Sequence, residues 1–151
     1  EEVCFTVICG RFNSHLKELI RLQSQEPRIK VLVDVSDMWN QMMEADITVS
    51  AAGSTMYELS AMGVPAVCCY YVENQRRIAE GFASLIGMTN AGDYSQYPNE
   101  TLSIITDAVC KLADSKEERE SLSSRMKQIV DGRGAKRIAQ ELCKDEICQH
   151  R

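Results

Sequence analysis

The sequence predicts an α/β domain of the Rossmann-like class, a parallel sheet with helices on both faces followed by a helical C-terminus. Short apolar segments with strand character alternate with segments of helical periodicity, and the loops between them are short. This alternation is typical of parallel strands joined by helices. The 151 residues have the size of one domain, so we expect a single domain over residues 1–151.

The first part of the chain contains the first three expected strands. Residues 3–9 form a near-continuous apolar run, as expected of a strand buried on both faces, and Gly10 to Asn13 break it. A helix is expected after Asn13, and Pro27 marks its end. Asp37 is a good N-cap for a second, short helix. We therefore expect helices over residues 14–24 and 38–44, and strands over residues 29–35 and 47–50.

The second part begins with a helix over residues 54–62. This helix ends at Gly63, which we expect to be a left-handed cap, and Pro65 follows it. A fourth strand over residues 66–71 comes next, then a helix over 74–86 and a short fifth strand over 88–90. After a loop over residues 92–98, we expect only helices, over residues 101–113, 116–130 and 135–148.

Composition excludes several classes of function. Hydrophobic residues make up 44% of the chain and charged residues 26%, with a net charge of −5. Because no basic block stands out, we expect no nucleic-acid partner. No apolar run approaches the roughly 20 residues that a membrane span needs, and the first residues show no signal-peptide pattern. The seven cysteines, an odd number in apolar patterns, indicate reduced thiols in a cytoplasmic protein.

The two ends of the sequence give two further expectations, one about a metal site and one about the length of the protein. The spacing of Cys143, Cys148 and His150 fits no standard zinc pattern, so we expect no metal site there. The chain begins Glu-Glu-Val-Cys, without a methionine, and enters a strand almost at once. We therefore expect a domain that belongs to a longer protein.

A turn of small residues after the third strand is the strongest candidate for a site. In open parallel sheets, ligands bind beyond the carboxyl ends of the strands. Gly53 lets a ligand approach the backbone, the first amides of the next helix are free to bind a phosphate, and Ser54 and Thr55 add hydroxyl groups. Glu58, one turn on, could accept hydrogen bonds from a ribose diol. The alternatives are tight helix–sheet packing and a plain capping box from Thr55 to Glu58.

The segment ADITVSAAGSTMYELSAMGVPAVCCYYVENQRRIAE resembles the C-terminal half of GT-B-fold nucleotide-sugar enzymes. It is most similar to the UDP-sugar hydrolases of nonulosonic-acid biosynthesis, of the pseudaminic-acid type, and to their spore-coat polysaccharide relatives. The pattern is ADxxxSxxGSTxxEL, then GVP, then a strand followed by NQxxxAE. The similarity to the peptidoglycan N-acetylglucosaminyltransferase is looser. The resemblance covers about residues 3–92, and its specific core runs from Ala45 to Glu80.

The resemblance implies a UDP-sugar ligand, held by residues at the carboxyl ends of strands. It assigns the diphosphate and neighbouring sugar to Gly53, Ser54 and Thr55, the ribose to Glu58, and the sugar to Asn74 and Gln75. It implies that the loop from Val35 to Met38 lines the uracil, largely through backbone groups. It also implies that the loop from Gly10 to Asn13 faces the interdomain cleft. It implies no cofactor and no metal.

The implied reaction is hydrolysis of a UDP-sugar to UDP and a free diacetamido-type sugar. In such hydrolases the proposed base is a histidine in a Gly-rich segment of the N-terminal domain, and this sequence has no such segment. His15 and His150 are more typical of solvated positions. We therefore expect the base to lie outside this chain, in an N-terminal domain that is its partner.

Two alternatives to the hydrolase stay open. The first is a glycosyltransferase with the same donor site and an acceptor hydroxyl in place of water. The second is a non-catalytic nucleotide-sugar-binding module fused to a cytidylyltransferase. The intact Gly53, Ser54 and Glu58 argue against the second alternative.

The sequence also predicts whether several further side chains are buried, exposed or close to the site. We expect Cys68 and Cys69 to be inert core thiols, and one of Tyr70 and Tyr71 to border the site. Arg76 and Arg77 are expected on a solvated helix face. Of Met38, Trp39, Met42 and Met43, we expect all but Met38 in the core.

Overall fold

The computed structural model describes residues 3–148, with side chains up to Cys143. The chain divides into two compact units: unit 1 ends at Gln41 and unit 2 begins at Met42. Each unit is described by itself. Whether residues 1–151 act as one domain stays a prediction.

Unit 1 is a two-stranded parallel sheet with one complete helix. Its elements are β1 (Phe5–Cys9), α1 (Leu16–Gln25), β2 (Ile29–Val33) and the start of α2 (Met38–Met43). The strands are parallel, with Phe5 opposite Ile29 and Cys9 opposite Val33. The side chain of Glu26 accepts hydrogen bonds from the side chain of Arg28 in the turn before β2, and these bonds lower the pKa of Glu26 to about 2. The predicted alternation of strand and helix is confirmed here.

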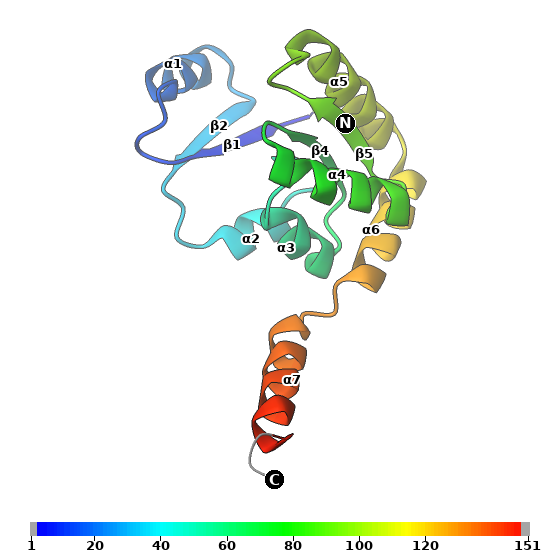
Figure 1. Cartoon of the computed structure of the whole chain (residues 1–151). Helices are drawn as coiled ribbons and strands as arrows, with labels where there is room; N and C mark the ends of the chain where they lie inside the picture. The colour runs from blue at the N-terminus through cyan, green and yellow to red at the C-terminus, as the bar shows by residue number, and fades with distance from the viewer. Residues whose placement is uncertain (1–2, 149–151) are drawn as a thin grey trace. The chain divides into compact units, whose positions relative to one another are not determined.

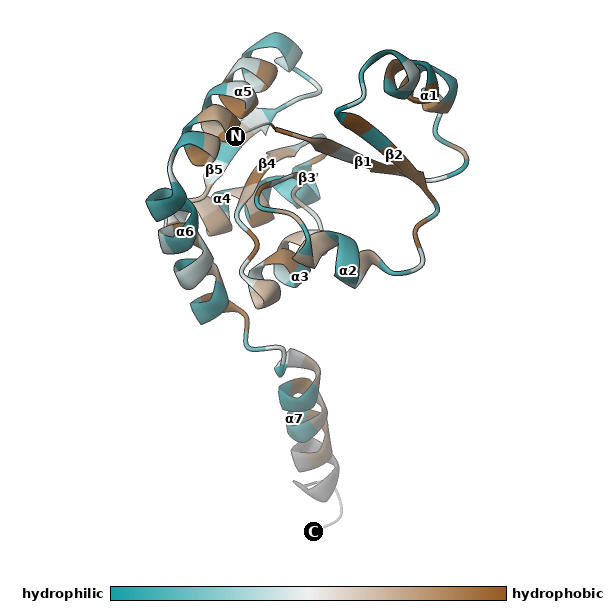
Figure 2. Cartoon of the chain, turned by 180° about the vertical axis from the view of Figure 1, so that it is seen from behind, coloured by the Kyte–Doolittle hydropathy of each residue, from teal (hydrophilic) through white to brown (hydrophobic). Residues whose placement is uncertain are grey.

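The predicted burial of β1 on both faces is wrong. Phe5 and Thr6 are exposed, and the residues from Val7 to Cys9 are half-buried. Figure 2 shows that β1 is nevertheless strongly hydrophobic. Within unit 1, β1 has a single neighbouring strand and a single complete helix, so its apolar run finds too few partners to be covered.

Unit 2 holds a three-stranded parallel sheet in the order β3–β4–β5, flanked by helices (Figure 1). Its strands are β3 (Thr48–Ala51), β4 (Ala66–Tyr70) and β5 (Thr89–Asp93). Its complete helices are α3 (Thr55–Met62), α4 (Glu73–Ile86), α5 (Pro98–Asp114), α6 (Lys116–Ile129) and α7 (Gly134–Cys148). The predicted fold class, parallel strands flanked by helices with a helical C-terminus, is confirmed.

The core of unit 2 lies around β4 and between α3 and α6. The first four residues of β4 are buried, as expected of a central strand. Met56 and Leu59 of α3, Phe82 of α4 and Met126 of α6 belong to one hydrophobic cluster with β4. Gly63 ends α3 in the left-handed conformation, with φ of 71°, and confirms the predicted cap. A Cβ atom at Gly63 would also collide with the side chain of Lys127, so α3 and α6 approach closely there.

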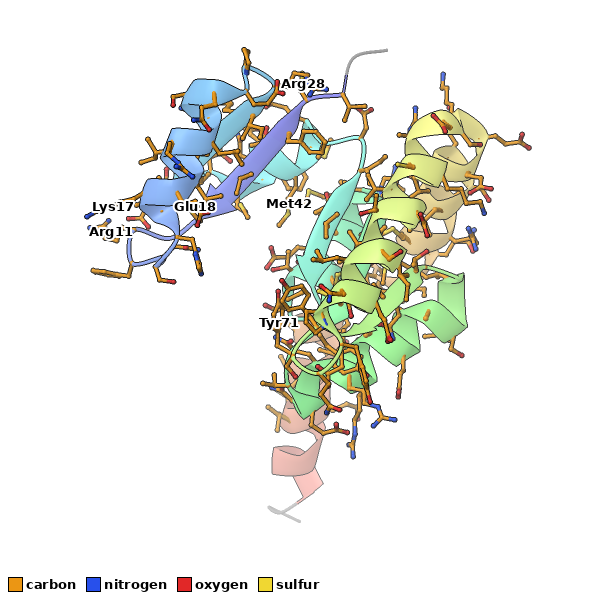
Figure 3. All side chains as sticks on the ribbon, turned by 90° about the horizontal axis from the view of Figure 1, so that it is seen from above. Arg11, Lys17, Glu18, Arg28, Met42 and Tyr71 are labelled. Atoms are coloured by element: carbon orange, nitrogen blue, oxygen red, sulfur yellow. The ribbon has the colours of Figure 1, made fainter. Side chains whose placement is uncertain are left out.

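The methionine and tryptophan positions of α2 are only partly as predicted. Met42, which is labelled in Figure 3, is 6% exposed and belongs to the core of unit 2. Trp39 and Met43 are 61% and 53% exposed, so their predicted burial is wrong. A helix of six residues makes fewer than two turns, and only Met42 of these side chains packs into the core. Asp37 caps this helix as predicted, because its carboxylate accepts a hydrogen bond from the Asn40 backbone N–H at 3.2 Å.

Among the residues that the structure describes, no helix has the length and apolar character that crossing a membrane requires.

Candidate functional site

The predicted site residues of unit 2 lie at one edge of its sheet. The residues from Gly53 to Glu58 follow the carboxyl end of β3, and Asn74 and Gln75 follow the carboxyl end of β4. Because β3 and β4 are hydrogen-bonded parallel neighbours, these two loops emerge at the same edge. This is where open parallel sheets bind their ligands.

The turn between β3 and α3 is fixed to the sheet by its backbone. The Ala52 N–H donates to the carbonyl of Cys69 at 2.8 Å, and Ala52 is fully buried. The Gly53 carbonyl then accepts from the Met56 N–H at 3.1 Å, which starts α3. Ser54 is exposed at the helix N-cap, and its hydroxyl makes no capping hydrogen bond. The turn therefore presents a free hydroxyl and the positive end of a helix at the sheet edge.

Gly53 has no structural reason to be glycine in the free protein. Its φ lies outside the left-handed region, unlike that of Gly63. A Cβ atom built on Gly53 meets nothing within 4 Å. The backbone of the turn is therefore open on the side where a side chain would stand. A ligand that contacts main-chain atoms at this point would explain the glycine.

Glu58 stands on the exposed face of α3, in its first turn. The carboxylate has no hydrogen-bond or ion-pair partner within the described part of the chain. The alternative prediction, a capping box from Thr55 to Glu58, is wrong. The N-cap residue is Ser54, and its side chain makes no capping hydrogen bond. The carboxylate of Glu58 is thus free to accept hydrogen bonds from a ligand.

Gln75 is oriented by the backbone of the loop before it. Its side-chain oxygen accepts a hydrogen bond from the Tyr71 N–H at 3.0 Å. The Gln75 side-chain NH₂ group is left with two hydrogens to donate. Asn74 is exposed beside it. Arg76 is held by Glu80 at 2.7 Å, an ion pair within α4 that agrees with the predicted solvated face.

The predicted site residues of unit 1 follow β1 and β2. Gly10 and Asn13 form a hydrogen-bonded turn, in which the Asn13 N–H donates to the Gly10 carbonyl at 3.0 Å. Val35 is half-buried and Met38 is 36% exposed. The structure thus places these four residues after the strands, as predicted, and it tests none of the contacts assigned to them.

Asp34 fixes the loop after β1, a role that was not predicted from the sequence. The carboxylate of Asp34 accepts a hydrogen bond from the Arg11 N–H at 2.8 Å and pairs with the Arg11 side chain. The φ of Asp34 is 50°, a left-handed conformation that aspartate tolerates better than most residues. The sequence signal was an acidic residue within a largely apolar segment that was predicted as a strand over residues 29–35.

The neighbouring thiols of β4 are not candidates for nucleophiles. Burial raises the pKa of Cys68 to about 12, and burial likewise raises the pKa of Cys69. Both stay protonated at neutral pH, as expected of inert core thiols.

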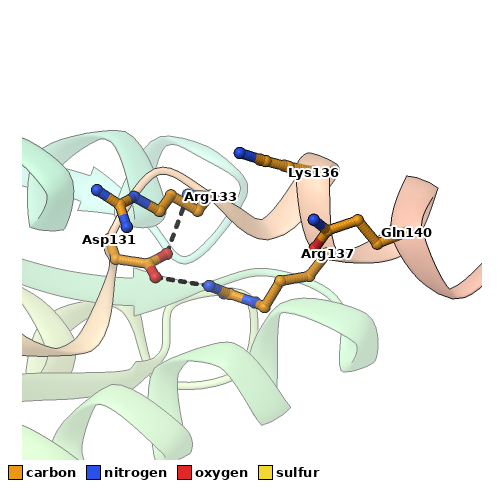
Figure 4. Close-up of a pocket in the computed structure, with 5 residues that line it drawn as sticks. All are labelled: Asp131, Arg133, Lys136, Arg137 and Gln140. Carbon is orange, nitrogen blue, oxygen red and sulfur yellow. Dashed lines mark hydrogen bonds and ion pairs between the residues drawn. The ribbon is translucent and has the colours of Figure 1, made fainter.

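A pocket of about 300 Å³ lies outside this sheet edge, at the turn before α7 (Figure 4). The carboxylate of Asp131 accepts hydrogen bonds there from the Arg133 N–H at 2.9 Å and from the Arg137 side chain at 2.5 Å. The pKa of Asp131 is lowered, first by the hydrogen bond from Arg137. The pocket is lined by Asp131, Arg133, Lys136, Arg137 and Gln140. Since none of them belongs to a strand-end loop, they are not part of the candidate site.

The structure describes only some of the residues considered for acid–base or metal chemistry. His15 is exposed, with its Nδ1 atom 3.5 Å from a carboxylate oxygen of Glu18. His150 and the side chain of Cys148 lie outside the described residues. Within the described part, no three histidine, cysteine or acidic side chains gather in a way that could hold a metal ion.

Comparisons with known proteins found curated relatives that are similar in sequence to this chain. Spore coat polysaccharide biosynthesis protein SpsG of Bacillus subtilis (strain 168) is 29% identical over 143 residues, 93% of this chain and 41% of that protein. An uncharacterized protein of Methanocaldococcus jannaschii is 26% identical over 80 residues, 53% of this chain and 16% of that protein. The chain thus spans less than half the length of either curated relative. No solved structure matches it.

The family comparison covers nearly the whole chain, including both units and most of the helical C-terminus. Residues 2–142 match the glycosyltransferase family 28 C-terminal domain. With the parallel strands and the open helix start at their carboxyl edge, this match establishes that the chain belongs to the glycosyltransferase family 28 C-terminal domain family.

Proposed function

We propose that this chain binds the UDP part of a UDP-sugar and serves as the donor-binding half of a glycosyltransferase in polysaccharide biosynthesis. The observation that carries the proposal is the open backbone at Gly53, where neither φ nor packing requires a glycine. The diphosphate lies against this backbone and the first amides of α3, with the hydroxyls of Ser54 and Thr55 beside it.

The remaining predicted contacts follow from the free groups around this turn. Glu58 has an unpaired carboxylate and accepts hydrogen bonds from the two ribose hydroxyls. Gln75 and Asn74 lie at the end of the neighbouring strand and bind the sugar, with the oriented NH₂ group of Gln75 as donor. In unit 1, the loops from Gly10 to Asn13 and from Val35 to Met38 are the proposed contacts with the cleft and the uracil.

This arrangement assists departure of UDP. The bond from the anomeric carbon to the diphosphate breaks as the nucleophile attacks, and negative charge grows on the leaving oxygens. The amides at the start of α3 stabilise that charge. The base that takes the proton from the nucleophile is proposed to lie in a part of the protein outside this chain.

Family membership favours an acceptor hydroxyl as the nucleophile. Hydrolysis of the same donor is a second candidate, because the Asn74-Gln75-Arg76 segment is most similar to the UDP-sugar hydrolases. Release of UDP from a UDP-sugar panel, assayed on the longest natural form of the protein, distinguishes the two. We expect release to depend on an added acceptor; release at the same rate in water alone would establish the hydrolase instead.

Replacing Gly53 with alanine tests the binding mode itself. We expect the affinity for UDP, measured by calorimetry, to fall about tenfold or more, because the added methyl group displaces the diphosphate from main-chain donors. The free energy of unfolding should stay the same or rise by about 0.4–1 kcal/mol, since the new Cβ meets no atom within 4 Å.

Gly81→Ala is the matched control. Gly81 also has ample space for a Cβ atom and lies within α4, away from the strand ends. This variant should bind UDP as the unmodified protein does. A folded Gly53→Ala protein with unchanged UDP affinity would place the diphosphate elsewhere.

A further inference from the structure

Two tyrosines form a ring pair at the carboxyl ends of β4 and β5. The ring centroids of Tyr71 and Tyr94 are 5.1 Å apart, with the ring planes inclined at 48°. Tyr71 follows β4 and Tyr94 follows β5, so the pair stands at the same sheet edge as the turn at Gly53. Figure 3 labels Tyr71 on this part of unit 2.

The backbone that carries Tyr71 is held by hydrogen bonds on both sides, and the ring itself contacts Tyr94. The Tyr94 N–H donates to the Tyr70 carbonyl at 2.9 Å, which ties the two loops together. The Tyr71 N–H donates to the side-chain oxygen of Gln75. Burial raises the pKa of Tyr71, and the neighbouring Cys69 and Tyr94 raise it further, so the phenol stays protonated at neutral pH.

Tyr71 is nevertheless 47% exposed. Tyr70, the preceding residue, packs against the hydrophobic core of unit 2, whereas Tyr71 does not belong to that cluster. Tyr71 is thus an ordered aromatic side chain whose exposed surface is not used in the core. Binding sites combine such surfaces with a few oriented polar groups, and Gln75 supplies an oriented amide beside it.

We propose that Tyr71, supported by Tyr94, forms a platform on which the sugar ring of the donor stacks, and that it determines specificity for the sugar. The inference rests on the proposed function. The C–H groups on the apolar face of a pyranose carry partial positive charge, which suits the negative face of an aromatic ring. The hydrogen bond from the Tyr71 backbone N–H to the Gln75 side chain holds the sugar-binding amide beside the loop that carries the ring.

Calorimetry with UDP and with UDP-N-acetylglucosamine as probes tests this proposal. We expect Tyr71→Ala to weaken binding of the UDP-sugar about tenfold, because about 50 Å² of apolar surface would stay in water, and to change the affinity for UDP by less than twofold. Tyr71→Phe keeps the ring and should retain the affinity for the sugar. Tyr97→Ala removes another exposed tyrosine, at the start of α5, and should change neither affinity.

The outcomes separate this inference from the proposed function. Equal losses for both probes would mean that Tyr71 contacts the nucleotide, and no loss for either would mean that it contacts no ligand; both overturn the inference alone. An unmodified protein that binds neither probe overturns the proposed function and the inference with it. If Tyr71→Ala does not fold, saturation-transfer NMR on the unmodified protein decides. Transfer from aromatic protons to the pyranose supports stacking, and no transfer to it refutes stacking.

Discussion

Replacing Leu59 with alanine is expected to lower the free energy of unfolding of unit 2 by about 2–5 kcal/mol. Leu59 is fully buried on α3, in the cluster that joins this helix to β4 and α6. Close packing of this interface, visible at Gly63 and Lys127, leaves little room for neighbours to fill the cavity. The loss would be a large fraction of the roughly 5–15 kcal/mol that stabilises a typical domain. Denaturant titration followed by circular dichroism measures it.

Leu85→Ala is the matched control for this substitution. Leu85 lies on α4, where it is 72% exposed, so the same change of side chain should cost at most about 0.5 kcal/mol. If Leu59→Ala cost no more than Leu85→Ala, the interface between α3 and α6 would not be the core that holds the site helix in place.

Local signals explain why several helices and the position of the turn at Gly53 could be predicted from sequence. A glycine two residues before a proline ends α3, and Gly63 has the left-handed φ that this pattern predicts. An aspartate before a short helix predicts a cap, and Asp37 forms it. The position of the turn at Gly53 follows from topology, since a strand that enters a helix in a parallel sheet brings its loop to the carboxyl edge.

The predicted end of β5 and the predicted start of α5 were wrong, because the proline and the glycine there each fit two kinds of structure. The loop predicted over residues 92–98 is shorter than expected, because α5 begins at Pro98. Proline suits the first helical position, where its missing N–H loses no hydrogen bond, and it marks a helix start as well as a loop. The strand β5 extends to Asp93, through Gly92 with φ of 92° and past a register shift opposite β4. Glycine usually marks the end of a strand in a sequence. At an irregularity of this kind, however, the strand continues through the glycine.

Burial could not be predicted from hydrophobicity alone. Phe5 and Trp39 are apolar, yet both are exposed, because burial depends on which neighbours the fold supplies. The same limit applies to the ring pair. One of Tyr70 and Tyr71 was expected to border the site from their place at the end of a strand, but the contact of Tyr71 with Tyr94 depends on the pairing of β4 with β5. Tertiary partners of this kind leave no periodic pattern in the sequence.

Replacing Glu58 with alanine is expected to weaken UDP binding about 10- to 150-fold, which corresponds to about 1.5–3 kcal/mol for hydrogen bonds to a charged group. Glu58 is next to Leu59 on α3, but it faces solvent and has no partner in the described part of the chain, so its loss should leave the free energy of unfolding almost unchanged. Adjacent positions on one helix should thus separate stability from binding. Glu117→Ala removes an acidic residue from the first turn of α6, far in sequence from the strand ends, and should not affect UDP binding.

A double-mutant cycle with 2′-deoxy-UDP identifies the partner of Glu58. If the carboxylate binds the ribose hydroxyls, the unmodified protein should bind 2′-deoxy-UDP more weakly than UDP, because one hydrogen bond to a charged acceptor is missing. Glu58→Ala should bind the two nucleotides equally, because the partner of that hydroxyl is already gone. The ribose assignment would be lost if the removed hydroxyl weakened binding equally in both proteins, or if a folded Glu58→Ala protein bound UDP unchanged. Either result would leave Glu58 as an acidic residue that only complements the positive end of the α3 dipole.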